Sequence, residues 1–167
     1  MLDKFLFLFH DLPRELIVIF VSTLPIFELR GAIPLGFAFH FPWYKVFLLA
    51  VLGNLIPIPF ILILLEPVSG RLRRFRIWRK FFDWLFERAR KKAREVERYE
   101  FWGLSIFVGI PLPMTGAWTG AIIASLIKMR FRKAFLSIAL GVLMAAVVVT
   151  LLVLMGRLII SLPASKA

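Results

Sequence analysis

Two charged residues, Glu28 and Arg30, stand inside an apolar part of the chain. They belong to the stretch LPIFELRGAIPLG at residues 24–36. An ionisable side chain at the centre of a membrane-spanning helix costs at least about 2.5–3.5 kcal/mol, so such residues are usually paired or functional. A desolvated carboxyl such as Glu28 can carry a coupling proton, because removal from water favours its neutral form. Arg30 has a forked set of donors that suits phosphate or carboxylate.

A second stretch, VGIPLPMTGAWTG at residues 108–120, has a similar mixture of proline, glycine and polar residues. Its candidate site residues are Pro111, Pro113, Thr115, Gly116 and Trp118. Thr115 supplies a hydroxyl, and Trp118 can stack on a ring or an acyl chain. A half-helix that begins near a glycine directs its positive end toward an anion.

Gly31 and Pro34 complete the first candidate set, and Asn54 is a further candidate. Gly31, like Gly116, allows the backbone to approach a ligand closely. Asn54 can contact a substrate, although asparagine also commonly holds membrane helices together. An alternative for Glu28 and Arg30 is a purely structural ion pair that caps a broken helix.

Other kinds of chemistry are not predicted. The chain has no cysteine and two isolated histidines, and its acidic residues do not fall at metal-ligand spacing. It contains no GxSxG or HExxH motif and no glycine-rich phosphate loop. We therefore expect neither an enzyme nor a cofactor or metal site.

The composition indicates which elements must position these residues. Hydrophobic residues make up 60% of 167, and the mean hydropathy is +0.86. Ordinary globular domains are about 45–50% apolar. The sequence therefore predicts an all-α integral membrane protein with a single membrane domain over residues 1–167.

Four apolar segments each exceed the ~20 residues that a helix needs to cross a bilayer. They cover residues 14–40, 43–67, 101–127 and 134–160, after an N-terminal interfacial segment at 1–13. The first and third carry paired prolines near their centres, which prevent one continuous helix. We predict that these two are re-entrant hairpins, which enter and leave the membrane on one face, and that the second and fourth are transmembrane helices.

The two halves of the chain resemble each other. YKVFLLAVLGNL at 44–55 aligns without a gap with RKAFLSIALGVL at 132–143, so that Lys45 matches Lys133 and Gly53 matches Gly141. Each half therefore contains one hairpin followed by one helix. With two such units in opposite orientations, the predicted plan is the inverted repeat of many secondary transporters.

The charge distribution sets the predicted orientation. Residues 71–98 contain twelve Lys/Arg against four Asp/Glu, and KMRFRK at 128–133 adds four basic residues. Both clusters flank apolar segments, which favours membrane topology over nucleic-acid binding. We place 69–100 and 128–133 on the cytoplasmic side of a multi-pass protein of the cytoplasmic membrane. Residues 70–100 predict a basic amphipathic helix on an anionic membrane surface, or alternatively one packed on the protein body or a dimer contact.

The motifs ELRGAIP, Gly53-Asn54 and PLPMTGAWTG together resemble those of the small multi-drug export protein family. That family looks related in plan to the DedA/VTT membrane proteins, which also pair two re-entrant hairpins and are associated with moving lipids across bilayers. By this resemblance, Glu28 and Arg30 occupy the first hairpin tip, and Pro111, Pro113, Thr115 and Gly116 the second. The chain is shorter than DedA proteins and has no arginine in its second tip.

These features predict a small DedA-like secondary transporter that can be proton-coupled and that moves an anionic amphiphile such as a polyprenyl-phosphate lipid carrier. In this prediction Glu28 carries the proton and Arg30 binds the headgroup. One alternative is a proton-coupled exporter of cationic drugs, and another is a lipid-binding or membrane assembly protein that transports nothing. With two full spans per chain we expect a homo-oligomer surrounded by membrane lipids, and no nucleic-acid partner.

Overall fold

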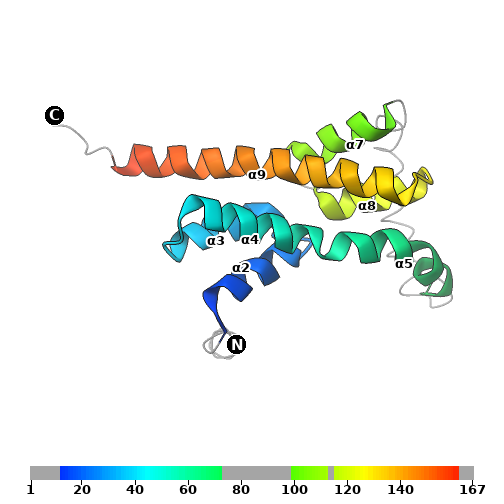
Figure 1. Cartoon of the computed structure of the whole chain (residues 1–167), viewed down its shortest axis with the longest axis horizontal. Helices are drawn as coiled ribbons and strands as arrows, with labels where there is room; N and C mark the ends of the chain where they lie inside the picture. The colour runs from blue at the N-terminus through cyan, green and yellow to red at the C-terminus, as the bar shows by residue number, and fades with distance from the viewer. Residues whose placement is uncertain (1–11, 73–98, 113–114, 162–167) are drawn as a thin grey trace. The chain divides into compact units, whose positions relative to one another are not determined.

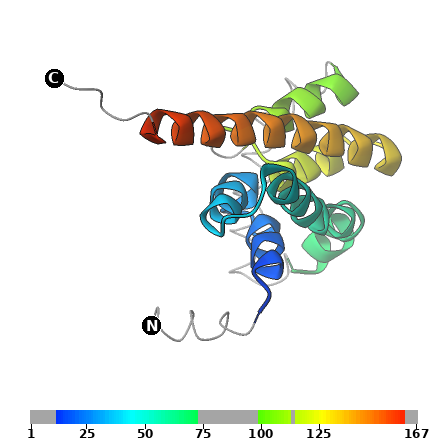
Figure 2. The same ribbon diagram turned by 60° about the vertical axis from the view of Figure 1, so that its left-hand side comes forward.

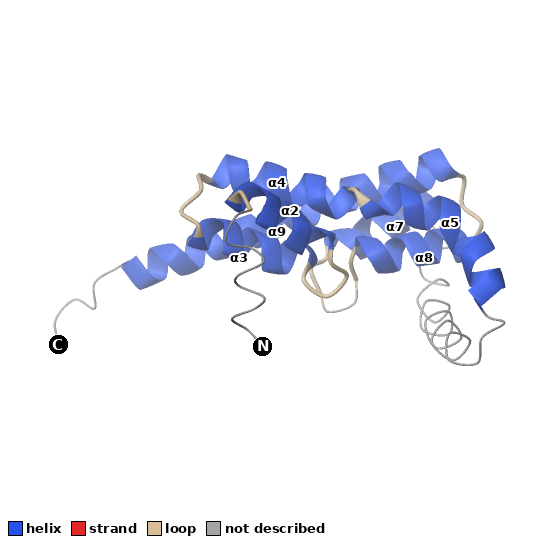
Figure 3. Cartoon of the chain, turned by 90° about the horizontal axis from the view of Figure 1, so that it is seen from below, coloured by secondary structure: helices blue, strands red, loops and turns tan. Residues whose placement is uncertain are grey.

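The computed structural model describes residues 12–72, 99–112 and 115–161, and these residues form helices and short connections (Figure 1). The helices are α2 (Arg14–Thr23), α3 (Glu28–Ala38), α4 (Trp43–Leu55), α5 (Pro57–Leu72), α7 (Glu100–Gly109), α8 (Ala117–Leu126) and α9 (Phe131–Ser161). No strand occurs in the described part of the chain, which confirms the predicted all-α class (Figure 3). The segment 1–11, most of the predicted amphipathic helix and Pro113 lie outside the described residues.

Two helical stretches of the described chain are long and apolar enough to cross a membrane. They are Trp43–Leu64, with 22 residues, and Phe131–Leu158, with 28 residues. Figure 2 shows α9 as one uninterrupted helix. The first stretch contains a single non-helical residue, Ile56, after which Pro57 begins α5. Proline is favoured at the first position of a helix, because that position needs no backbone N–H.

Each of the two proline-containing segments forms a pair of short helices, as the sequence predicts. α2 ends at Thr23 and α3 begins at Glu28, with Pro25 in the connection. In the second segment α7 ends at Gly109 and α8 begins at Ala117. At 1.5 Å per residue these helices are only about 15 Å long. That is half of the ~30 Å hydrocarbon core, so none of them spans a bilayer alone.

Pro34 behaves differently from the prolines in the connections. It lies inside α3 on an exposed face, and the helix continues past it to Ala38. Because proline has no backbone N–H, the carbonyl of Arg30 has no donor at its i+4 position in this helix. The helix break in the first segment is therefore set by the Pro25 connection and not by Pro34.

The chain divides into two compact units. Unit 1 consists of Met1–Asn54 with Ala146–Ala167, and unit 2 of Leu55–Ala145. Buried aliphatic side chains form the core of each: Val18, Ile33 and Val46 in unit 1, and Leu104, Ile123 and Ile138 in unit 2.

In unit 1, helix α4 packs closely against α2 through Gly53. A Cβ atom at Gly53 would lie 2.5 Å from the carbonyl oxygen of Ile19 and 2.9 Å from Cβ of Ser22. The Ser22 hydroxyl also donates a hydrogen bond of 2.5 Å to the carbonyl of Ala50. Glycine is therefore required at position 53, because any side chain would push the two helices apart.

In unit 2, Gly141 of α9 makes the corresponding contact with α7. A Cβ atom there would lie 2.6 Å from the carbonyl oxygen of Ser105 and 2.6 Å from Cβ of Val108. The Ser105 and Ser137 hydroxyl oxygens are 3.0 Å apart, so the same two helices are also joined by a buried hydrogen bond. Both glycines thus contact two residues three positions apart on the first helix of the preceding pair.

The turns that lead into α4 and into α9 are also alike. His40 and Lys128 have left-handed backbones, with φ of 61° and 53°. The N–H of Phe41 donates to the carbonyl of Gly36 at 3.2 Å, and the N–H of Met129 to that of Ala124 at 2.9 Å. In each case the N–H donates to the carbonyl five residues earlier, which is the 6→1 hydrogen bond of a Schellman motif. This motif ends a helix and satisfies its last carbonyls.

An ion pair joins the start of the short-helix pair to the start of the following long helix in each unit. In unit 1, Lys45 Nζ lies 2.6 Å from Glu15 Oε1. In unit 2, Lys133 Nζ lies 3.7 Å from Glu100 Oε2. Both pairs are partly exposed, so they contribute little to stability alone, but they occupy matching positions.

Candidate functional site

The connection between α2 and α3 lies at the level of the middle of the span Trp43–Leu64. The hydroxyl of Thr23, the last residue of α2, is 3.0 Å from the carbonyl oxygen of Gly53, the eleventh of the 22 residues in that span. This carbonyl lacks its helical donor, because residue 57 is a proline. Thr23 therefore satisfies a carbonyl that the proline leaves open, and it fixes the position of the connection.

Glu28 begins α3 directly after this connection. Glu28 is 9% exposed, and it is the only charged residue that is buried among those whose side chains the structure describes. Its backbone is left-handed, with φ of 45°, and its N–H donates to the carbonyl of Leu24 at 3.0 Å. A non-glycine residue in this conformation costs of order 1–3 kcal/mol, and such residues cluster at functional sites. The structure thus combines a buried carboxyl with local backbone strain.

Arg30 and Gly31 follow in the same first turn of α3. Arg30 is half-buried, and both Glu28 and Arg30 make interactions within the protein. A Cβ at Gly31 would lie 2.8 Å from Cβ of Phe27, so the helix start folds tightly over the connection. The geometry brings the predicted residues Glu28, Arg30 and Gly31 into one helical turn.

Asn54 is buried without a hydrogen-bond partner. It is 1% exposed, and neither its Nδ2 nor its Oδ1 has a partner in the described part of the chain. Leaving a buried polar group unpaired costs about 1–3 kcal/mol, so it needs an explanation. The matching residue in unit 2 is Val142, which is equally buried at 1%. Packing at this position therefore does not require an amide.

In unit 2, the Thr115 hydroxyl is engaged by its own loop. Its Oγ1 lies 2.6 Å from the carbonyl oxygen of Ile110 and 2.9 Å from that of Leu112, and it accepts from the Leu112 N–H at 3.1 Å. The loop before α8 is thus closed around one buried threonine. Its predicted role in substrate binding stays a prediction, while its part in holding the loop is visible.

The other predicted residues of unit 2 surround this loop. Gly116 precedes α8 with an extended backbone, and its carbonyl accepts from the Gly120 N–H at 2.9 Å. Pro111 and Trp118 are half-buried, and Trp118 makes interactions within the protein. Pro113 lies outside the described residues. Glu28 and Thr115 belong to different units, and the prediction that the two tips face each other stays untested.

The sequence interpretation did not predict the Glu15–Lys45 and Glu100–Lys133 ion pairs or the contact of Arg157 with α3. Hydrogen bonding from Lys45 lowers the pKa of Glu15 below its ordinary value. Arg157 Nη2 donates to the carbonyl of Phe37 at 2.7 Å, near the end of α3. The pairing of Glu15 with Lys45 could have been found from the matched Lys45 and Lys133, since a glutamate also lies at the start of each broken segment: Glu15 is the second residue of one, and Glu100 directly precedes the other. Nothing in the local sequence indicates the long-range contact of Arg157.

No group of three or more potential metal ligands occurs among the residues that the structure describes. The candidate site in unit 1 consists of Glu28, Arg30 and Gly31 in the first turn of α3 and Asn54 in α4.

Comparison with known proteins identifies a family. The model of the family described as "Putative small multi-drug export protein" matches residues 28–148, a range that begins at the first residue of α3, includes the break between α7 and α8, and ends within α9. Neither a curated protein nor a solved structure matches the chain.

Proposed function

The chain belongs to the small multi-drug export protein family, and we propose that it is a secondary transporter that exports amphiphilic compounds with proton coupling at Glu28. The observation that carries the proposal is the buried, strained Glu28 at a helix break. Among the described residues, two helical stretches have the length and composition of membrane spans. A carboxyl in such a place can exist neutral when dry and charged when water reaches it, which is the requirement for a proton carrier.

The proposed architecture is an inverted repeat of a re-entrant hairpin and a transmembrane helix. Three pairs of matching features support it: the packing of Gly53 and Gly141, the turns at His40 and Lys128, and the two Glu–Lys ion pairs. The half-bilayer length of α2, α3, α7 and α8 supports the hairpins. The hydrogen bond from Thr23 to Gly53 supports a first tip near mid-membrane depth.

In the proposed mechanism the hairpins rock against the long helices and expose the first tip to one face at a time. On the face with the higher proton concentration Glu28 takes up a proton and becomes neutral, which lowers the cost of closing the apolar tip around it. When the tip opens on the opposite face, water favours the charged form, and the proton leaves. A cationic substrate moves in exchange for the proton, because both are attracted to the same carboxylate. An anionic substrate moves together with the proton, because only neutral Glu28 does not repel it.

Two substrate classes fit this mechanism, and each rests on a specific observation. A cationic drug is favoured by the buried carboxylate of Glu28 and by the family description. An anionic amphiphile, such as a polyprenyl-phosphate lipid carrier handled in a DedA-like manner, is favoured by Arg30 in the first turn of α3. There the positive end of the helix and the guanidinium point to the same kind of ligand. A lipid-binding or membrane assembly role without transport is the third alternative, and the thermal-stability panel below tests it.

The sidedness of the protein is part of the proposal. We place it in the cytoplasmic membrane with 69–100 and 128–133 on the cytoplasmic face, because the basic clusters then lie on one side. A homo-oligomer embedded in membrane lipids stays a prediction from the small number of full spans.

Transport in proteoliposomes tests the central role of Glu28. A pH gradient of about one to two units across the vesicle should drive movement of a fluorescent quaternary-ammonium dye in the wild type, and Glu28→Gln should abolish the dependence on the gradient. Glu15→Gln is the matched control, because it removes a partly exposed glutamate from the same unit. Gradient-driven transport at wild-type rate in Glu28→Gln would refute proton coupling at this residue.

A thermal-stability panel separates the substrate classes. A ligand that binds only the folded state raises stability by about 2.7 kcal/mol at a hundredfold excess over its Kd. Stabilisation by polyprenyl phosphate that disappears in Arg30→Gln assigns an anionic headgroup to this turn. Stabilisation by cationic drugs alone that disappears in Glu28→Gln assigns drug export. Polyprenyl phosphate that stabilises the protein without crossing the bilayer supports the lipid-binding alternative.

A further inference from the structure

The end of α3 and the connection that leads to α4 hold three phenylalanines at alternate positions, and each lies close to a cation from a different helix. Residues 37–41 read FAFHF. The guanidinium of Arg14, from α2, lies 5.7 Å from the ring centroid of Phe39, and Lys45 Nζ, from α4, lies 4.3 Å from that of Phe41. The guanidinium of Arg157, from α9, lies 5.0 Å from the ring of Phe37. We call Arg14, Lys45, Arg157 and these three phenylalanines the cation–phenylalanine cluster.

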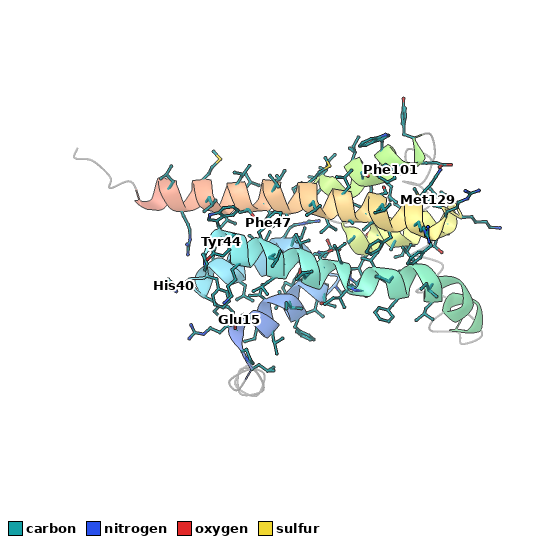
Figure 4. The ribbon with its side chains drawn as sticks, in the orientation of Figure 1. Glu15, His40, Tyr44, Phe47, Phe101 and Met129 are labelled. Carbon is teal, nitrogen blue, oxygen red and sulfur yellow. The ribbon has the colours of Figure 1, made fainter. Side chains whose placement is uncertain are left out.

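All parts of this cluster lie at ends of apolar elements of unit 1. Arg14 is the first residue of α2, and Lys45 is the third residue of the span that begins at Trp43. Arg157 is the residue before the last of the span Phe131–Leu158. Figure 4 shows Glu15, His40 and Tyr44 at this same end of unit 1. Ends of spans coincide with the boundary between hydrocarbon and water, where lipid phosphates lie.

The charges of the cluster are incompletely balanced. Glu15 pairs with Lys45, but no carboxylate is paired with Arg14 or Arg157 among the described residues. Arg157 uses Nη2 for the carbonyl of Phe37 and is otherwise exposed. Stacking on a ring leaves the in-plane N–H groups of a guanidinium available, and these groups suit the oxygens of a phosphate. Three cations against one carboxylate leave the cluster with a net positive charge.

The matching turn of unit 2 has no such aromatic set. Its residues 125–129 read SLIKM, although its backbone hydrogen bonds are the same. The turn itself therefore does not require the phenylalanines. Next to the cluster, Trp43 and Tyr44 are exposed by 57% and 62%. Exposed tryptophan and tyrosine are enriched where protein meets lipid headgroups.

We propose that the cation–phenylalanine cluster is a binding site for the phosphate of an anionic phospholipid in the surrounding leaflet. Arg14 and Arg157 bind the phosphate oxygens, while Trp43 and Tyr44 lie against the glycerol and upper acyl region. The proposal goes beyond the transport function and does not depend on which compound is exported.

Fluorescence quenching of Trp43 tests the proposal directly. A variant that keeps only this tryptophan is reconstituted in bilayers that contain brominated phosphatidylglycerol or brominated phosphatidylcholine. Preferential binding of the anionic lipid should quench Trp43 more strongly than the zwitterionic lipid at equal mole fraction. One basic residue near a membrane surface contributes about 1 kcal/mol to attraction of anionic lipid, so Arg14→Gln should lower the preference about fivefold.

Additional variants distinguish a specific site from misfolding or general attraction. Glu15→Gln removes the carboxylate that is paired with Lys45 of the cluster and should increase the preference for phosphatidylglycerol. A damaged fold would not increase this preference. Arg157→Lys keeps the charge and should retain part of the preference, whereas Arg157→Gln should lower it. Lys133→Gln, at the corresponding position of unit 2, should leave Trp43 quenching unchanged. Equal quenching by both lipids in the parent protein, or an equal loss with Lys133→Gln, would overturn the proposal.

Discussion

Substitution of Gly53 or Gly141 by alanine probes a close helix contact that occurs in both units and supports the proposed internal repeat. In each unit the glycine lets a long helix approach the first short helix of the preceding pair. The added Cβ would lie 2.5 Å from the Ile19 carbonyl oxygen at position 53, and 2.6 Å from that of Ser105 at position 141. Both obstructing atoms are backbone atoms, which cannot move without moving their helix.

The size of the effect follows from these distances. Ordinary contacts begin near 3.4 Å, so each pair of helices must separate by roughly 1 Å. Overpacking of this kind costs typically about 1–3 kcal/mol. The separation also weakens the adjoining hydrogen bonds, Ser22 to Ala50 or Ser105 with Ser137, at about 1 kcal/mol each. Alanine recovers about 1 kcal/mol of helix propensity. We expect a net loss of about 1–3 kcal/mol for each substitution.

Thermal unfolding of detergent-purified protein measures this loss. We expect Tm to fall by roughly 2–10 °C for Gly53→Ala and similarly for Gly141→Ala, on the scale of a domain of this size. Gly156→Ala is the control in the same kind of helix, because nothing lies within 4 Å of its added Cβ, and it should keep or slightly raise Tm. If Gly53→Ala and Gly141→Ala unfold at the same temperature as Gly156→Ala, the close packing described for both units is wrong.

Three further predictions follow from single contacts. The pKa of Glu15 is lowered, chiefly by its hydrogen bond with Lys45, so the stability that this pair adds is present above the ordinary pKa of 4.5 and disappears as pH falls through the lowered pKa. Lys45→Gln should therefore reduce the dependence of Tm on pH in the acid range. An unchanged dependence would contradict the pairing. Thr115→Val should cost about 1–3 kcal/mol, measured by denaturant or thermal unfolding, because it removes the hydrogen bonds that the buried Thr115 hydroxyl makes with Ile110 and Leu112. Thr119→Val, in the following helix, is its control. Asn54→Val should leave stability unchanged or raise it by up to about 1–3 kcal/mol, because it removes a buried amide that has no partner in the described part of the chain. The same substitution should reduce transport in proteoliposomes, and full transport activity would exclude Asn54 from the site.

The sequence predicts the features of this fold that depend on local chemistry. An apolar composition predicts a membrane protein, and the prolines predict discontinuous segments at residues 14–40 and 101–127. The structure confirms the all-helical class and shows both discontinuities. The prediction was less specific about which proline matters. Pro25 lies in the break, whereas Pro34 is accommodated on the exposed face of α3, and the helix continues past it to Ala38.

The candidate site could be predicted only as a list of residues. Glu28, Arg30 and Gly31 could be grouped from the sequence because they lie within four consecutive residues. The structure adds the burial and the left-handed backbone of Glu28. Sequence could not show that the Thr115 hydroxyl is taken up by its own loop, or that Arg157 reaches Phe37 from 120 residues away. Such contacts depend on the packing of segments that are far apart in the chain.

The two units are most alike where they serve as scaffold and differ where chemistry is proposed. Glycines, helix-ending turns and ion pairs recur in both, so these features are requirements of the fold. Asn54 stands where unit 2 has Val142, and the phenylalanines beside Arg14, Lys45 and Arg157 have no counterpart in SLIKM. A residue that the second unit replaces without loss of packing is not needed for packing in the first. An unpaired buried amide disfavours a protein that only has to fold, and at the matched positions of unit 2 the structure shows neither such an amide nor phenylalanines beside the turn. These two differences argue that unit 1 binds the ligands.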